Sequence, residues 1–236
     1  MALPSWIARH EPACASVDIV MMRILSLNAG FPRTFAHDGR EVATGIFKEP
    51  VSGPRMLRLL NLDGDGQADL QNHGGRDKAV YAYPSEHYPV WRRELPGMEL
   101  PWAIFGENLT TEGLREEDAC IGDEYRAGGA MLRVRQPRIP CYKLGIRFGR
   151  ADIVKKFLAS GRSGIYFSVV GEGMVSSGDP IERIHRDAHG ISVADAQRAY
   201  LAGPSELPLL RRVVRAEILP TGLQQDLLRR LATLEK

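Results

Sequence analysis

The chain has 236 residues, enough to bury a hydrophobic core in one main domain with a small appendage. Its 31 basic and 29 acidic residues leave a net charge of +2, which argues against a general nucleic-acid binder or a membrane-surface binder. No apolar run reaches the length of a membrane span, and three cysteines without paired or zinc-type spacing indicate a reducing cytoplasm.

The first 21 residues lack the basic start and the long apolar run of a secretory signal. We expect residues 1–21 to be an N-terminal extension, either flexible or added by an upstream start codon, and assign them no function. The segment from Met21 to Asn28 reads as the opening strand of the folded part.

Short strands are predicted from Arg23 to Ile184, separated by turns rich in Gly, Pro and Asp. Met131–Arg135 shows the partial alternation of a half-buried strand. Many short strands at this spacing favour a barrel or a sandwich over a parallel sheet. The predicted strands are Ile24–Asn28, Thr44–Lys48, Met56–Leu62, Ala79–Tyr83, Ile104–Thr110, Glu124–Arg126, Met131–Gln136, Ile165–Val170 and Pro180–Ile184.

Two helices are expected to interrupt these strands. One follows Ser85, although Pro89 obscures where it begins. The other covers Asp152–Ser160, which has apolar residues along one side and a helix-stopping glycine at Gly161.

After Gly190 the pattern becomes helical, and three short helices are predicted. Ser192 is a plausible N-cap for the first, Pro208 suits the first turn of the second, and Thr221–Gln224 resembles a capping box for the third. Helices this short need tertiary cover, so we expect them to pack on each other, on the β-rich part or on a second copy of the chain. The apolar stripe of the third helix is Leu223, Leu227, Leu228, Leu231 and Leu234.

Cys141 has the most informative surroundings. It follows Pro137 and Pro140 and lies between Arg138 and Lys143, so cations favour its thiolate while the prolines restrict its direction. A thiolate attacks electrophiles and binds soft metals. A buried structural thiol remains the alternative. Cys120 follows an acidic stretch that disfavours a thiolate.

Other motifs lead to exclusions. The Asp-rich segment 63–69 has Ala68 and Gly74 where a calcium-binding EF-hand loop needs glycine and glutamate, so we interpret it as a polar turn. The sequence contains neither a P-loop nor a dinucleotide fingerprint.

Four blocks carry a family resemblance: His73–Tyr81, Gly106–Thr110, Gln136–Cys141 and Arg162–Tyr166. In this order they resemble the MOSC proteins, a superfamily named after the C-terminal domain of molybdenum-cofactor sulfurase, and specifically its YiiM branch. The resemblance begins near Met22 and extends to the C-terminus. It implies a mainly β fold with α-helices, in which a MOSC-type β-barrel over residues 22–188 is followed by a small three-helix C-terminal domain over residues 189–236.

The resemblance also implies a molybdenum cofactor (molybdopterin), with Cys141 as the metal ligand. The phosphate of the pterin suits arginine, lysine and backbone amides, so Arg138, Lys143 and Arg162 are candidate anchors. Gly164 and the Gly74–Gly75 pair would let the backbone approach the ligand. His73 could supply a proton, and Asn108 could turn its amide toward the pocket. For each of these residues, ordinary surface charge or turn geometry remains the alternative.

The implied reaction removes oxygen from N-hydroxylated substrates such as 6-hydroxylaminopurine-like bases. Because the chain lacks flavin, nicotinamide and cysteine-cluster motifs, we expect an external electron-donor protein. Neither nucleic acid nor membrane is expected as a partner, and a homodimer is possible. Three alternatives stay open: a sulfur carrier with a persulfide on Cys141, a hydrolase using Cys141 and His73, and a binding module that uses the three helices.

Overall fold

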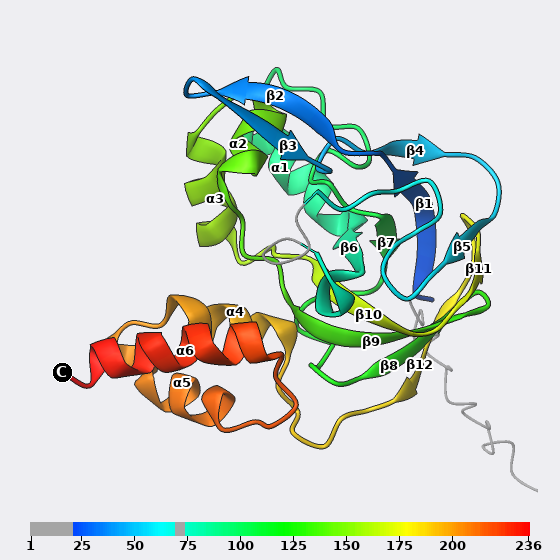
Figure 1. The fold of residues 1–236 in the computed structure, drawn as a ribbon. Coiled ribbons are helices and arrows are strands. Elements are labelled where there is room, and N and C mark those ends of the chain that lie inside the picture. Colours follow the sequence, from blue (N-terminus) through cyan, green and yellow to red (C-terminus); the bar gives the residue numbers. More distant parts are fainter. Residues whose placement is uncertain (1–20, 69–73) are drawn as a thin grey trace, which may run out of the picture.

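A computed structural model describes residues 21–68 and 74–236, and its centre is one large sheet (Figure 1). The eight strands of this sheet are joined by seven pairings, and only the pairing between β6 and β7 is parallel. In spatial order the strands are β12 (Ile181–His185), β8 (Glu124–Ala127), β9 (Ala130–Pro137), β10 (Ile165–Gly171), β6 (Val80–Pro84), β7 (Leu109–Glu112), β1 (Arg23–Ala29) and β4 (Glu49–Val51).

Two small two-stranded sheets flank the large one. β2 (Arg33–His37) and β3 (Arg40–Thr44) form a hairpin, whose turn residues Asp38 and Gly39 both have positive φ, as a tight hairpin turn requires. β5 (Arg55–Leu57) pairs with β11 (Gly173–Val175). The sequence analysis predicted neither this hairpin nor β11.

The expected closed barrel requires a correction, because the strands of the described residues form an open ladder. The start of β1 meets residues 178–181 through an isolated bridge between Arg23 and Pro180 and a few backbone hydrogen bonds, among them the one from the Ile181 amide to the Met22 carbonyl at 2.7 Å. Farther along, the same edge of β1 pairs with β4 through residues Leu27 to Ala29. Only the first residues of β1 are therefore available to the segment before β12, and a continuous ladder cannot form there.

Three helices and an aromatic cluster lie at one end of the molecule. The helices are α1 (Tyr88–Glu94), α2 (Tyr142–Phe148) and α3 (Asp152–Ser160). Phe105 lies within the cluster, with its ring centroid 4.4 Å from that of Tyr83, 5.3 Å from that of Phe148 and 5.9 Å from that of Phe157. Both expected helices are confirmed, and Gly161 ends α3 in the left-handed conformation. α2 was not predicted.

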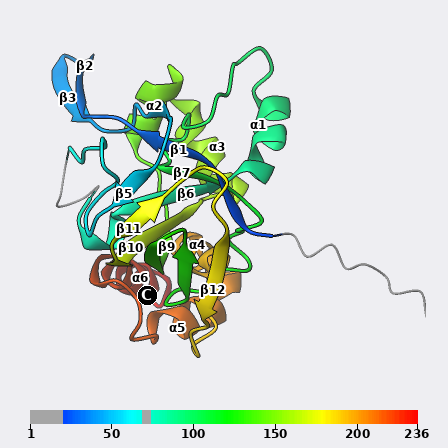
Figure 2. The same ribbon diagram turned by 90° about the vertical axis from the view of Figure 1, so that its right-hand side faces the viewer.

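The helical tail consists of α4 (Val193–Leu201), α5 (Leu207–Val214) and α6 (Thr221–Leu234). Figures 1 and 2 place it at the opposite end of the molecule from the β2–β3 hairpin. The Ser192 hydroxyl accepts a hydrogen bond from the Asp195 amide at 3.0 Å, which confirms the predicted N-cap of α4. The capping box at Thr221 is wrong, because Thr221 is already helical and Pro220, which has no polar side chain, stands at the N-cap.

The tail shares one continuous apolar core with the sheet. Val193, Leu210 and Leu227 belong to the same buried cluster as Ile121 and Leu132. Backbone hydrogen bonds reinforce this contact, because the Val193 amide donates to the Ala119 carbonyl at 2.9 Å and the Ile121 amide donates to the Ile191 carbonyl at 2.8 Å. The tail therefore completes the core beside β9 rather than standing apart from it.

Candidate functional site

Cys141 lines a cavity of about 100 Å³, which we call the Cys141 cavity. The residue follows β9, stands at the N-cap of α2 and is partly exposed, so its thiol can be reached from outside. Cys120, by contrast, is buried, and its pKa is raised by burial and by Asp123. The cavity also contains residues from four other parts of the chain, at 44–48, 65–68, 78–81 and 106–108, together with Tyr166.

The lining of the Cys141 cavity is basic. Its cations are Lys48, Lys78, Arg138 and Lys143, whereas Asp65 is the acidic residue among the lining side chains. Lys48 and Asp65 are both buried and form an ion pair between Nζ and Oδ1. A lining in which basic side chains outnumber acidic ones suits an anionic ligand.

Asp65 and Asn108 form the centre of a buried hydrogen-bond network. Asp65 accepts hydrogen bonds from the Gly30 amide at 3.0 Å and from Asn108 Nδ2 at 2.9 Å. Asn108 Oδ1 accepts one from the Tyr81 amide at 3.1 Å. Asn108 lines the Cys141 cavity, and its amide fixes the Lys48–Asp65 pair relative to β6.

Burial also affects the charge of Lys48. Removal of water lowers the pKa of its ammonium, and the charge of Arg138 lowers it further, while Asp65 opposes both effects. A lysine in such surroundings gives up its proton more readily than one in water. Lys48 is therefore a candidate proton donor in the lining of the Cys141 cavity.

Arg138 is held by contacts on several sides. It is buried, its Nη1 donates to the Phe105 carbonyl, and its guanidinium carbon lies 4.9 Å from the ring centroid of Tyr81 and 5.7 Å from that of Phe157. These rings fix its direction through cation–π contact. The aromatic end of the molecule thus positions one of the predicted anchors beside Cys141.

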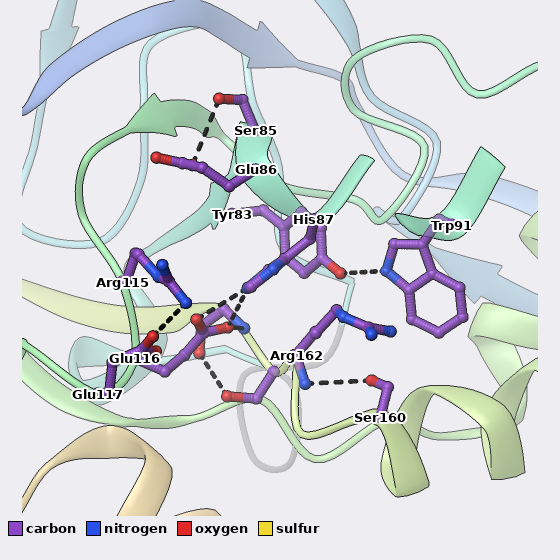
Figure 3. Close-up of polar contacts among 12 residues, drawn as sticks. Tyr83, Ser85, Glu86, His87, Trp91, Arg115, Glu116, Glu117, Ser160 and Arg162 are labelled. Carbon is purple, nitrogen blue, oxygen red and sulfur yellow. Dashed lines mark hydrogen bonds and ion pairs between the residues drawn. The ribbon is translucent and has the colours of Figure 1, made fainter. Parts of the chain in front are cut away.

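Arg162 and Gly164 lie outside the Cys141 cavity. Arg162 pairs with Glu94 at 3.0 Å, and its guanidinium carbon lies 5.5 Å from the ring centroid of Trp91, as Figure 3 illustrates for the arginine and the indole. Gly164 has a φ of +65°, and a Cβ there would approach the Tyr81 ring to 2.6 Å. Among the predicted residues, the structure thus brings Asn108, Arg138 and Lys143 to Cys141, but not these two.

A buried histidine, absent from the predictions, supports this segment. His87 Nε2 lies 2.9 Å from Glu116 Oε2 (Figure 3). Glu116 Oε1 accepts a hydrogen bond from the Gly164 amide at 2.6 Å. The Tyr81 hydroxyl then donates to the Ser163 carbonyl at 2.7 Å. The His87–Glu116 pair therefore helps to fix the Tyr81 ring that lies against Arg138.

A second depression, which we call the tail groove, also reaches Cys141. Its volume is about 580 Å³, and its walls are residues 74–78, residues 136–141 and the helical tail. Gly74 and Gly75 line this groove rather than the Cys141 cavity, and the Gly75 amide donates to Gln67 Oε1 at 2.9 Å. His73 lies outside the described residues.

Lys48, Asp65 and Lys78 line the Cys141 cavity but were not predicted from the sequence as site residues. Asp65 was interpreted only as part of a polar turn, which it is, but its carboxylate also points inward to Lys48. Lys48 was assigned to a strand, whereas residues 45–48 form a loop between β3 and β4. Within the described residues, no group of three or more His, Cys, Asp or Glu side chains could hold a metal ion. A metal bound to Cys141 would therefore need its other ligands from a bound cofactor.

Comparisons with known proteins agree with this architecture. The model of the MOSC domain matches residues 69–182. The uncharacterized protein YflK of Bacillus subtilis is 47% identical over 191 residues, covering 81% of this chain and 86% of that protein. Protein YiiM of Escherichia coli is 45% identical over 145 residues, covering 61% of this chain and 65% of that protein. A reductase of Gibberella moniliformis is 35% identical over 175 residues, or 73% of this chain and only 31% of its own length.

Solved structures give the same result. The crystal structure of YiiM from Geobacillus stearothermophilus aligns with a TM-score of 0.73 and 32% identity, covering 89% of this chain and 99% of that one. YiiM from Escherichia coli aligns with a TM-score of 0.68 and 35% identity, covering 80% and 90%. The chain therefore belongs to the MOSC-domain proteins, and its fold is YiiM-like. Within the described residues, no helix has both the length and the apolar character to cross a membrane.

Proposed function

We propose that the chain is a molybdenum-cofactor-binding reductase that removes oxygen from N-hydroxylated compounds, with 6-hydroxylaminopurine-like bases as substrates. The observation that carries this proposal is the reachable thiol of Cys141 in a cavity whose cations outnumber its carboxylates. Its relation to a fungal protein named reductase adds support for redox chemistry.

The donor groups of the cavity have the chemistry that such a cofactor requires. A thiolate is a soft donor for molybdenum, and the phosphate of a pterin suits a basic pocket. Cys141 would ligate the metal, while Arg138, Lys78 and Lys143 would hold the anionic part. Asn108 and the backbone at Gly106 would face the flat ring system. Arg162 is not included, because its guanidinium is engaged with Glu94 and Trp91.

When bound, the cofactor would supply oxygen-atom removal from the N–O bond. The overall change is balanced when a hydroxylamine takes up two electrons and two protons to give an amine and water. We propose that Lys48 Nζ holds one of these protons at the cavity wall, where Asp65 orients the ammonium and burial favours its release. The electrons would come from a separate electron-donor protein.

The proposal is tested by turnover of a 6-hydroxylaminopurine-like base, with protein made in a molybdenum-replete host and a chemical reductant in place of the donor. Cys141→Ser should abolish turnover, whereas Cys120→Ser, at the buried thiol, should retain it. Full activity in the Cys141 variant would contradict the proposal. Sulfane sulfur on Cys141 in protein that lacks molybdenum would instead support the sulfur carrier.

A further inference from the structure

The tail groove and the Cys141 cavity meet at Cys141. Both are lined by Cys141, Lys78, Ile139 and Tyr166, so a molecule in the groove would touch the residues that face the cavity. The groove is also much larger, at about 580 Å³ against about 100 Å³. A volume in this range suits a small-molecule ligand, because such pockets usually span about 300–1,000 Å³.

The outer wall of the groove comes from the helical tail. Tyr200 of α4 lines it together with Gln225, Asp226 and Arg229 of α6. Leu223 and Leu227 anchor α6 in the core, and Leu223 also lines the groove. The tail thus serves the site in addition to packing on the sheet.

The charges of the groove differ from those of the cavity. Arg76, Lys78 and Arg229 are accompanied by Asp77 and Asp226, so the lining is close to neutral. Asp77 is also engaged by Arg135 at 2.7 Å. A mixed lining of this kind selects against a strong anion and suits a neutral, polar molecule.

The aromatic and amide side chains of the tail groove indicate which class of ligand it can bind. Tyr166 and Tyr200 offer ring faces, while Gln136 and Gln225 offer donors and acceptors. Asp226 Oδ1 pairs with Arg229, and within the described part of the chain Asp226 Oδ2 carries no hydrogen bond. A carboxylate oxygen in that position can accept an N–H from the edge of a ring.

We propose that the tail groove binds the substrate of the reductase, a neutral and flat heteroaromatic base, and that Asp226 and Tyr200 of the tail determine its specificity. The reduction of the base in this inference rests on the proposed function. The binding of the base in the tail groove does not depend on it. The base would lie between the tail and η1 (Arg76–Lys78), with its N–O group at Cys141 and one ring N–H at Asp226 Oδ2.

Kinetics with a chemical reductant test the specificity. Asp226→Asn should raise the KM for a heteroaromatic N-hydroxylated base about tenfold or more, because a charge-assisted hydrogen bond is lost, with kcat and molybdenum content unchanged. Tyr200→Leu should act in the same direction. Glu235→Gln is the matched control, because it removes an Arg–carboxylate pair at the end of α6 away from the groove, and it should leave KM unchanged. N-hydroxyurea, which has no ring, should be reduced equally by all these variants.

Direct binding separates this inference from the proposed function. Calorimetric titration of the intact chain with a 6-aminopurine base needs neither molybdenum nor turnover, and Asp226→Asn should weaken that binding about tenfold. Equal affinity of the wild type and both groove variants would overturn the inference even if the reductase is real. An unchanged KM for the base, combined with a raised KM for an electron-donor protein, would assign the groove to protein docking and would also overturn it.

Discussion

Lys48 and Arg138 are cations that the fold buries, whereas Lys78 and Lys143 lie partly in solvent at the same cavity. The buried pair is fixed by internal partners, Asp65 for Lys48 and the Phe105 carbonyl for Arg138. Lys78 and Lys143 are only partly buried and line the same cavity as Cys141.

We expect the buried ion pair between Lys48 and Asp65 to contribute to the stability of the fold. Lys48→Met would leave Asp65 buried without its counter-charge, which should lower the free energy of unfolding by about 3–5 kcal/mol. Urea unfolding measures this loss. As a control, Glu49→Gln removes the exposed pair with Arg33 and should change stability little. Equal effects of the two substitutions would show that Lys48 and Asp65 do not depend on each other.

At the scale of elements, local signals predicted much of the fold. The β9 pattern, the Gly161 stop and the Ser192 cap were read correctly because each acts on its own few residues. The strand predicted at Thr44–Lys48 is wrong because residues 45–48 form a loop in which Lys48 pairs with Asp65, a residue 17 positions away in the sequence. The closure of the sheet likewise depends on which segment occupies an edge of β1, and local patterns do not contain that information.

Some residues of the candidate site could be predicted from the sequence and others could not. Cys141, Arg138 and Lys143 were predicted because they are close together in sequence, and Asn108 through the family resemblance, and all four line the Cys141 cavity. Lys48 and Asp65 were not found, since their importance arises only from their contact across the fold.

Substitutions at Gly161 and Gly164 test the packing of the segment that lies against the Tyr81 ring, which in turn contacts Arg138. Gly161 and Gly164 both have positive φ, but a Cβ at Gly161 meets open space, whereas at Gly164 it meets the Tyr81 ring. Gly161→Ala should cost about 1 kcal/mol for the backbone conformation alone. Gly164→Ala should cost more than about 3 kcal/mol, because overpacking adds to that strain. Denaturant unfolding of the two variants compares them, and similar losses would contradict the close packing at Tyr81.

In the molecule as a whole, the sheet and the helical tail share one buried core. Buried residues of β9, including Leu132 and Val134, belong to the cluster that the tail helices complete. The tail groove lies along this same junction, so stability and access to Cys141 depend on the same contact.

Removal of residues 192–236 should therefore unfold the chain or make it aggregate, because the β9 side of the core would be exposed. Size-exclusion chromatography and near-UV circular dichroism of the truncated protein measure the outcome. A soluble, monodisperse protein with the near-UV spectrum of the intact sheet would contradict the shared core.

Whether the chain binds a molybdenum cofactor through Cys141 is tested most directly by analysis of molybdenum and pterin in the purified chain, produced in a molybdenum-replete host. We expect stoichiometric amounts of both in the wild type, in Cys120→Ser and in Arg162→Ala. The amounts should fall in Lys143→Ala and be lost in Cys141→Ser after extensive dialysis, because these residues line the Cys141 cavity and Arg162 does not. A wild-type protein without molybdenum or pterin, or a Cys141 variant that retains both in full, would contradict the account.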